Sequence, residues 1–308
     1  MTVHGESAVV PSATRAEAAQ ALKDFLATYN RAEKAYDEQV LDAVVTGQYG
    51  DGKKASLRAN RSIRPGGNTK FKPLELTDAT FMIPKRAGWP RFFVANTDSN
   101  RDAGTSRAAN RVVLLFTKFG AALPWKVAHV AVLTPDEVPV FKTDKDGWAE
   151  ALDPAAKDLA IPPAELSKRY AAYLTNGQPN GFAPGSQTTG RRAVRARYAE
   201  RPGKSTQWID QALDAGTYTP MGLRTQNGGG FVFFSCRHYE QVKIDKSVKG
   251  AKLPLSASVR ALMTGTPNDT LVREFESAQT VTVPPADATN PRALFLSRTQ
   301  ALVSAKGS

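Results

Sequence analysis

The start of the chain carries an apolar pattern that is typical of helices. Over residues 14–36 apolar side chains recur every three or four positions, and Thr14 with Glu17 forms the signature of a capping box. We therefore predict a helix over this stretch, followed by a shorter helical segment over 37–45. Residues 47–75 are rich in Gly, Lys, Arg and Asn without a clear period, so we expect mainly loop there.

From Leu76 onward the apolar period changes from helical spacing to strict alternation. Residues 76–97 predict a hairpin, and residues 112–116 are apolar on both faces, as in a central strand. Residues 124–134 alternate and predict a further strand, whose inward positions are Trp125, Val127, His129, Ala131 and Leu133. The first half is thus expected to place helices first and antiparallel strands second.

The second half repeats this order of elements. Residues 162–177 have the spacing and the terminal Asn-Gly of a helix, and a second helix is predicted over 205–216. Strand patterns follow in four stretches, which are 230–244, 255–263, 271–283 and 294–303. Both halves therefore predict an antiparallel meander that packs on the helices preceding it.

A proline-rich stretch separates the two patterns. Residues 135–163 contain five prolines and several acidic residues, which interrupt every apolar period. We predict an α+β protein with a first domain over 1–143, a linker over 144–161 and a second domain over 162–308. Each domain is expected to be a curved antiparallel sheet packed on N-terminal helices, a shape similar to NTF2-like and cystatin-like cones.

The chain is strongly basic, and the excess charge is uneven. Its net charge is +12, and residues 151–308 hold 20 basic against 12 acidic side chains. Such a field favours anionic partners, among them nucleic acid, lipid headgroups and wall polymers, although a charge that serves solubility alone explains it equally well.

The cysteine count and the hydropathy exclude several classes of protein. Cys236 is the single cysteine, which excludes an intramolecular disulfide and a zinc site built from several cysteines. No apolar run approaches the roughly 20 residues of a membrane helix. The first residues also lack the basic start and apolar middle of a signal peptide.

Several short segments resemble a family of uncharacterised actinobacterial lipoproteins. They are residues 2–6 (TVHGE), 9–11 (VVP), 84–91 (PKRAGWPR), 98–101 (DSNR) and 173–177 (YLTNG). The resemblance implies that Met1 stands in place of a removed signal peptide and lipobox cysteine. It also implies an extracytoplasmic protein that meets the membrane only through an N-terminal lipid anchor lying outside this sequence.

The densest basic feature is a run in the second half. It contains Arg191, Arg192, Arg195, Arg197, Arg201 and Lys204, interrupted by one acid, Glu200. Helical spacing would stack Arg191 with Arg195 and Arg197 with Arg201, and guanidinium groups match the geometry of phosphates. These six residues are our candidates for contact with an anionic envelope component, and an ordinary solvated helix face is the alternative.

Two other groups of residues are candidates for chemistry. His129 falls on the apolar face of its predicted strand, where it lines a pocket as a base or forms a hydrogen-bonded part of the core. Cys236, His238 and Glu240 share one strand face. Two potential metal ligands on one strand are too few for a metal site. A lone Cys among apolar residues is usually part of the core.

Nucleotide and nucleophile motifs are weak or missing. Residues 47–54 (GQYGDGKK) nearly match a phosphate-binding loop, but Lys54 takes the position of the Ser/Thr that holds magnesium. A glycine-rich end of a helix explains the stretch better. The sequence also lacks a Gly-x-Ser-x-Gly elbow, a Ser-x-x-Lys motif and a dinucleotide fingerprint.

These observations favour a non-catalytic cell-envelope lipoprotein that presents a surface or pocket to a ligand or protein partner, with no cofactor. The alternative is a small-molecule carrier or enzyme with an NTF2-like pocket on the His129 strand face. Nucleic-acid binding is disfavoured, because Tyr198 is the one aromatic residue interleaved with the basic run.

Overall fold

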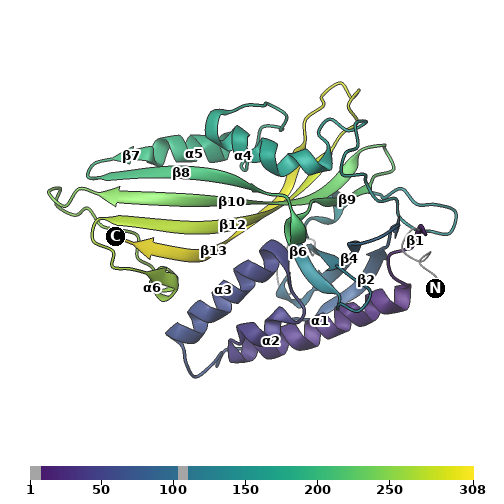
Figure 1. The fold of residues 1–308 in the computed structure, drawn as a ribbon, viewed down its shortest axis with the longest axis horizontal. Coiled ribbons are helices and arrows are strands. Elements are labelled where there is room, and N and C mark those ends of the chain that lie inside the picture. The colour runs from purple at the N-terminus through teal and green to yellow at the C-terminus, as the bar shows by residue number, and fades with distance from the viewer. Residues whose placement is uncertain (1–7, 103–109) are drawn as a thin grey trace, which may run out of the picture.

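The computed structural model describes residues 8–102 and 110–308 as two large sheets with helices packed against them (Figure 1). The α-helices are α1 (Arg15–Ala35), α2 (Glu38–Asp42), α3 (Gly47–Ile63), α4 (Leu166–Asn176), α5 (Thr189–Ala199) and α6 (Ala257–Leu262). Short 3-10 helices cover Asn100–Asp102, Pro135–Glu137, Pro163–Glu165 and Gly216–Tyr218. The predicted α+β class is confirmed. The opening stretch 2–6, with His4, lies outside the described residues.

The strands of the first sheet are β2 (Leu76–Met82), β4 (Arg91–Ser99), β5 (Arg111–Lys118) and β6 (Lys126–Leu133), in the order β2-β4-β5-β6. Every neighbouring pair is antiparallel, which confirms the predicted hairpin and the central position of β5. A separate small ladder joins β1 (Val10–Pro11) to β3 (Lys85–Arg86).

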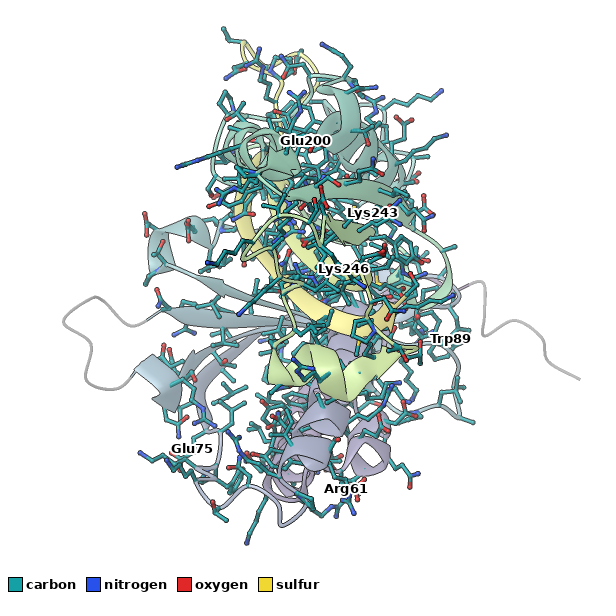
Figure 2. All side chains as sticks on the ribbon, turned by 90° about the vertical axis from the view of Figure 1, so that its left-hand side faces the viewer. Arg61, Glu75, Trp89, Glu200, Lys243 and Lys246 are labelled. Carbon is teal, nitrogen blue, oxygen red and sulfur yellow. The ribbon has the colours of Figure 1, made fainter. Side chains whose placement is uncertain are left out.

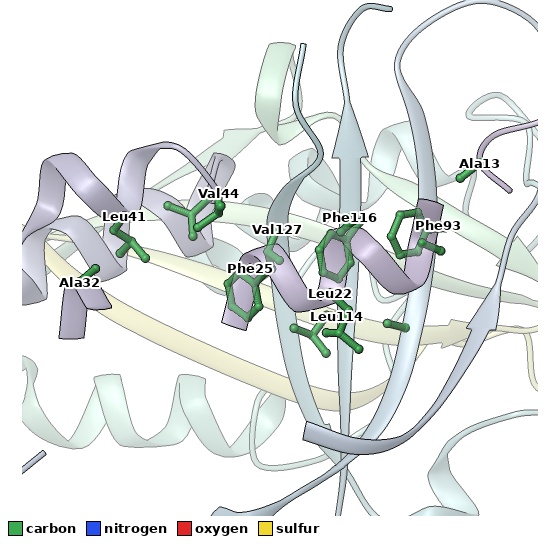
Figure 3. Packing of buried hydrophobic residues seen from close by; sticks show 14 of the residues in the cluster. Ala13, Leu22, Phe25, Ala32, Leu41, Val44, Phe93, Leu114, Phe116 and Val127 are labelled. Atoms are coloured by element: carbon green, nitrogen blue, oxygen red, sulfur yellow. The ribbon is translucent and has the colours of Figure 1, made fainter. Parts of the chain in front are cut away.

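Helix α1 covers this sheet with an aromatic core beneath it (Figure 3). Its predicted capping box is present, since the Glu17 N–H donates to Thr14 Oγ1 at 3.1 Å and the Thr14 N–H donates to Glu17 Oε2 at 2.6 Å. Phe25 meets the edge of Phe116 with ring centroids 6.0 Å apart, and Phe116 stacks on Phe93 at 4.7 Å. The helix and sheet therefore share one apolar interior, as their periodicities predict.

The prediction of mainly loop over 47–75 is wrong for residues 47–63, which form helix α3. Its glycines serve close packing. Gly47 has φ +56°, and a Cβ there would lie 2.7 Å from the Thr217 carbonyl oxygen. A Cβ on Gly52 would lie 2.6 Å from the Cβ of Ala301. Glycine lowers local helix propensity, so tertiary contact overrides the local signal here.

The second sheet is longer and has the order β11-β13-β12-β10-β8-β7, with β9 paired to β10. Its strands are β7 (Glu200–Arg201), β8 (Lys204–Leu213), β9 (Met221–Arg224), β10 (Gly230–Ile244), β11 (Met263–Thr264), β12 (Thr270–Val283) and β13 (Leu294–Gly307). Helices α4 and α5 lie along one side of this sheet, and α3 lies on the other (Figure 1). Figure 2 looks along the molecule from the end that carries Glu200, Lys243 and Lys246.

Two predicted elements of the second half are wrong. The expected helix over 205–216 is strand β8, which pairs with β10 along its whole length and alternates in burial, with Thr206 buried and Ile209 60% exposed. The expected strand over 255–263 is helix α6, whose N-cap Ser256 accepts a hydrogen bond from the Val259 N–H. In both cases a short apolar run fits either period, and long-range pairing decides.

A shared apolar cluster joins the two sheets. It contains Phe92, Val113 and Leu133 from the first sheet and Phe231 and Phe233 from β10. Separate clusters lie beneath α1 and beneath α4. The halves therefore each have a core of their own and bury a third core between them.

The stretch predicted as a linker, residues 144–161, lies against both halves of the protein. Ala149 N–H donates to Ile83 O in the first half at 3.0 Å, and Leu152 N–H donates to Gly222 O in the second at 2.9 Å. The stretch thus contacts both halves while it connects them. The domain boundaries at 143 and 162 stay a prediction.

Truncation at the junction tests whether the halves unfold together. Phe233 is 2% exposed and meets Phe231 edge-on at 5.1 Å. We expect Phe233→Ala to lower the free energy of unfolding by about 3–5 kcal/mol, measured by urea denaturation, in a single transition. Ile209→Ala on an exposed position should change it by less than about 0.5 kcal/mol. Two separate transitions in the wild type would contradict the cooperative junction.

Candidate functional site

Helix α3 separates two clefts, and the first lies between α3, β6, α6 and β13. We call it the α3–α6 cleft, and its volume is about 410 Å³. Its lining residues are Gln48, Tyr49, Gly52, Lys53, Ser56, Ala59, Asn60, Val130, Val132, Ser258, Leu262, Thr299, Gln300, Ala301 and Leu302. Small side chains on α3 leave this space open, while β6, α6 and β13 contribute most of the larger aliphatic groups.

The polar side of the α3–α6 cleft is an ion pair beside two tyrosines. Lys53 Nζ lies 2.5 Å from Glu33 Oε1 and 4.9 Å from the centre of the Tyr29 ring. Burial opposes its charge, yet Tyr29 and Glu33 outweigh that effect and raise the pKa of Lys53. Burial also raises the pKa of Tyr49 well above its usual range. At neutral pH this side therefore presents a paired ammonium and a protonated phenol.

The second cleft, the α2–α3 cleft, lies on the opposite side of α3 and is more charged. It has a volume of about 580 Å³, and the ionisable side chains lining it are Glu38, Asp42, Asp51, Lys54, Arg58, Tyr218, Arg237, Glu274 and Glu276. Most of these groups pair with one another. Lys54 Nζ lies 2.7 Å from Asp42 Oδ1, and Tyr218 donates a hydrogen bond to Asp51.

Glu276 is the buried member of the α2–α3 cleft. It is 2% exposed, and its Oε1 accepts from Arg237 Nη2 at 2.6 Å. Burial raises the pKa of Glu276, and Arg237 opposes this only in part. The Glu276 main-chain carbonyl also accepts from Gln48 Nε2 of α3 at 3.3 Å, so one residue ties the sheet to the helix between the clefts.

The predicted basic run is divided among several surroundings. Arg195 turns inward and forms a two-pronged ion pair with Asp210, at 2.5 and 2.8 Å. Arg191 also turns inward, and its Nη2 donates to Gln300 Oε1 at 3.1 Å. The predicted stacking of Arg197 with Arg201 on one helix face is wrong, because α5 ends at Ala199 and Arg201 belongs to β7.

The remaining members of the run lie toward the surface of α5 and its end. Arg192 lies over the Tyr173 ring at 5.6 Å, and Arg201 lies over the Tyr198 ring at 3.9 Å. Arg197 is exposed, and Lys204 is half-buried at the start of β8. The structure therefore brings Arg191 and Arg195 together and leaves Arg197 apart. Their contact with an anionic partner stays a prediction.

His129 lies in the core between the two sheets. It is 3% exposed, its Nε2 is 3.3 Å from Thr280 Oγ1, and its ring meets the edge of Phe233 at 5.0 Å. Burial lowers the pKa of His129 to about 3. It lines neither the α3–α6 nor the α2–α3 cleft. Its imidazole is therefore neutral at physiological pH and tied to a threonine of the second sheet.

The face shared by Cys236, His238 and Glu240 packs beneath α4 and α5. Cys236 Sγ lies 3.3 Å from Ser167 Oγ, and burial raises the pKa of its thiol to about 12. His238 stacks on Phe275 at 5.1 Å, while Glu240 pairs with Arg273. Among the described residues no group of three or more His, Cys, Asp or Glu could hold a metal ion.

The residues of the two clefts were missed in the sequence, as was the helix they share. The stretch resembling a phosphate-binding loop is the first half of α3, where Lys53 pairs with Glu33 and Lys54 with Asp42. Its spacing of Gly50 and Gly52 was a usable signal, since glycines within a helix mark close approach of another element. The partners on α6 and β13 come from more than 190 residues further on, and no local pattern points to them.

Two buried histidines make stability depend on pH. Burial and neighbouring arginines lower the pKa of His238 to about 2, and His129 is similarly neutral. As the pH falls below about 6.5, both histidines gain protons in the unfolded chain but not in the folded chain. The folded protein therefore becomes less stable as the pH is lowered. Lowering the pH from 7 to 5 should reduce the free energy of unfolding by about 2 kcal/mol for each histidine.

His129→Gln should reduce this pH dependence, because the amide retains a hydrogen-bonding group for Thr280 and does not titrate. Urea denaturation at pH 7 and pH 5 should show a loss that is smaller by about 2 kcal/mol in the variant than in the wild type. An unchanged difference between the two pH values would show that His129 is not neutral in the folded protein.

Comparison with known proteins bears out the resemblance noted in the sequence. The chain is 43% identical over all of its 308 residues to an uncharacterized lipoprotein of Streptomyces avermitilis, and it covers 90% of that protein. It is 44% identical over the same length to the uncharacterized lipoprotein SCO2278 of Streptomyces coelicolor, again covering 90%. The lipoprotein SCO6871 of S. coelicolor is 23% identical over 283 residues, which are 89% of this chain and 78% of the relative.

The family comparison covers nearly the whole chain. Residues 9–307 match the model of a domain of unknown function, DUF8094, so the match includes both sheets and both clefts. None of the helices in the described ranges is long and apolar enough to cross a membrane. The chain belongs to the DUF8094 family and is related to lipoproteins of Streptomyces.

Proposed function

We propose that this chain is the extracytoplasmic part of a membrane-anchored envelope lipoprotein and that it binds a small amphipathic molecule without transforming it. The observation that supports binding is the α3–α6 cleft. Its volume of about 410 Å³ falls within the range of small-molecule sites, roughly 300–1,000 Å³. The names of the relatives support the anchor.

The lining of the α3–α6 cleft defines the occupant. Aliphatic side chains of Val130, Val132, Leu262 and Leu302 suit an apolar body. Val132 is 50% exposed, so its side chain is accessible to a molecule in the cleft. Ser56 and Asn60 on α3 suit a hydrogen-bonding end. Because Lys53 is already neutralised by Glu33, the polar end of the ligand is expected to be uncharged.

The same lining favours binding over catalysis. The titratable side chains that line the cleft are Tyr49 and Lys53. Both have raised pKa values, so neither exchanges protons readily near pH 7. The alternative of an NTF2-like enzyme needs His129 to act as a base, and burial makes that imidazole a weak one.

A plug in the cleft tests the binding proposal. Ser56 lines the cleft from α3, and Ser56→Trp should fill it without touching the core. With N-phenyl-1-naphthylamine, a neutral amphipathic fluorophore, the wild type should bind saturably, and the variant should bind at least about tenfold more weakly. The control Ser62→Trp lies on the same helix outside the cleft and should bind as the wild type does. Equal binding by a folded Ser56→Trp variant would refute the proposal.

The proposed anchor has a separate test. The full-length precursor, expressed in a Streptomyces host with alkyne-tagged palmitate, should incorporate the label and sediment with membranes. Replacing the lipobox cysteine that we expect before Thr2 by serine should abolish the label and release the protein to the soluble fraction. A precursor without such a cysteine, or an unlabelled product, would contradict the anchor and leave the cleft test unaffected.

A further inference from the structure

Helix α5 covers a face of the second sheet that carries more positive than negative charge. Four arginines lie there, which are Arg191 and Arg195 on α5, Arg273 on β12 and Arg298 on β13. The carboxylates that pair with them are Asp210 with Arg195 and Glu240 with Arg273. His238 lies among all four and is neutral, because burial and their charges lower its pKa to about 2.

Arg191 and Arg298 are left without a carboxylate. Among the described residues neither takes part in an ion pair, and both donate to the same atom, Gln300 Oε1, at 3.1 and 2.9 Å. Two cations that share one neutral acceptor repel each other. Burial, together with the charges of Arg298 and Arg195, lowers the pKa of Arg191 to about 10.

The hydrogen-bonding capacity of this pair is also incomplete. The Nε atoms of Arg191 and Arg298 are buried, and within the described ranges neither has a hydrogen-bond partner. A buried guanidinium is normally paired and hydrogen-bonded, because removing it from water otherwise costs free energy. The Nε atoms of Arg195 and Arg273 also lack a partner, so Arg191 and Arg298 differ from them in lacking a carboxylate as well.

We infer that Arg191 and Arg298 form a binding site for a phosphate-type oxyanion at the α5–β13 edge. Two guanidinium groups match the several oxygens of a phosphate. Gln300 is exposed and belongs to the open part of β13, so its amide marks the entrance and can turn aside. Arg195 stays paired with Asp210, which neutralises it, so Arg195 is not one of the inferred ligands. Gln300 also lines the α3–α6 cleft, so the site adjoins that cleft, although neither arginine lines it.

The experiment compares two charge-removing variants with a matched control. Arg191→Gln and Arg298→Gln remove the inferred ligands, and Arg197→Gln removes an exposed arginine of the same helix. In thermal melts, inorganic phosphate should raise the Tm of the wild type and of Arg197→Gln by roughly 2–4 °C relative to chloride at equal ionic strength. The two site variants should show no such shift. Without phosphate each should melt at or above the wild-type temperature, because it removes one of two repelling charges.

A second arm distinguishes a free phosphate from a lipid headgroup. Flotation with phosphatidylglycerol vesicles, against phosphatidylcholine vesicles, should show loss of binding in Arg191→Gln and Arg298→Gln but not in Arg197→Gln if the source is a headgroup. A phosphate shift without selective flotation assigns the site to a soluble phosphate. Absence of both effects in the wild type, or both site variants behaving as Arg197→Gln does, would overturn the inference.

Discussion

The close approach of α3 to β13 is the contact on which the arrangement of this protein depends. Gly52 meets Ala301 so closely that a methyl group at position 52 would overlap it. At the start of the helix, Gly47 adopts a backbone conformation that suits glycine and lies against Thr217. Bulkier residues would push the helix away from the second sheet. Both clefts exist because α3 is held at this distance, with one opening on each side of it.

The periodic parts of this fold were accessible from the sequence, and the parts set by long-range contact were not. Helix α1 has a helical period with a cap at each end, and the apolar runs of β4, β5 and β10 were predicted as strands, so local chemistry and tertiary structure agree. In β8 the spacing of Trp208, Ile209 and Ala212 also fits a helix, and pairing with β10 decides the outcome. Helix α3 is the opposite case, since its glycines argue against a helix locally and favour it once β13 is present.

The inferred anion site at Arg191 and Arg298 also depends on contacts that the sequence does not reveal. Arg191 was singled out in the sequence because basic residues cluster around it. Its special property, however, arises from Arg298 and Gln300 on a strand more than 100 residues away. Charge density identifies a basic helix, whereas only the fold shows which arginine has a carboxylate. Arg195 and Arg191 lie one turn apart on α5, and Asp210 neutralises one of them and leaves the other.

Burial acts on the titratable groups of this protein in two distinct ways. Where the group is neutral when buried, as in His129, His238 and Cys236, the core absorbs it and the group loses its chemistry near pH 7. Where the group cannot give up its charge, as with arginine, the cost of burial persists until a counter-charge arrives. The histidines that first suggested catalysis are therefore neutral parts of the core. The two arginines without a carboxylate would gain free energy by binding an anion. This division is the physical basis of our proposal that the protein holds ligands and does not transform them.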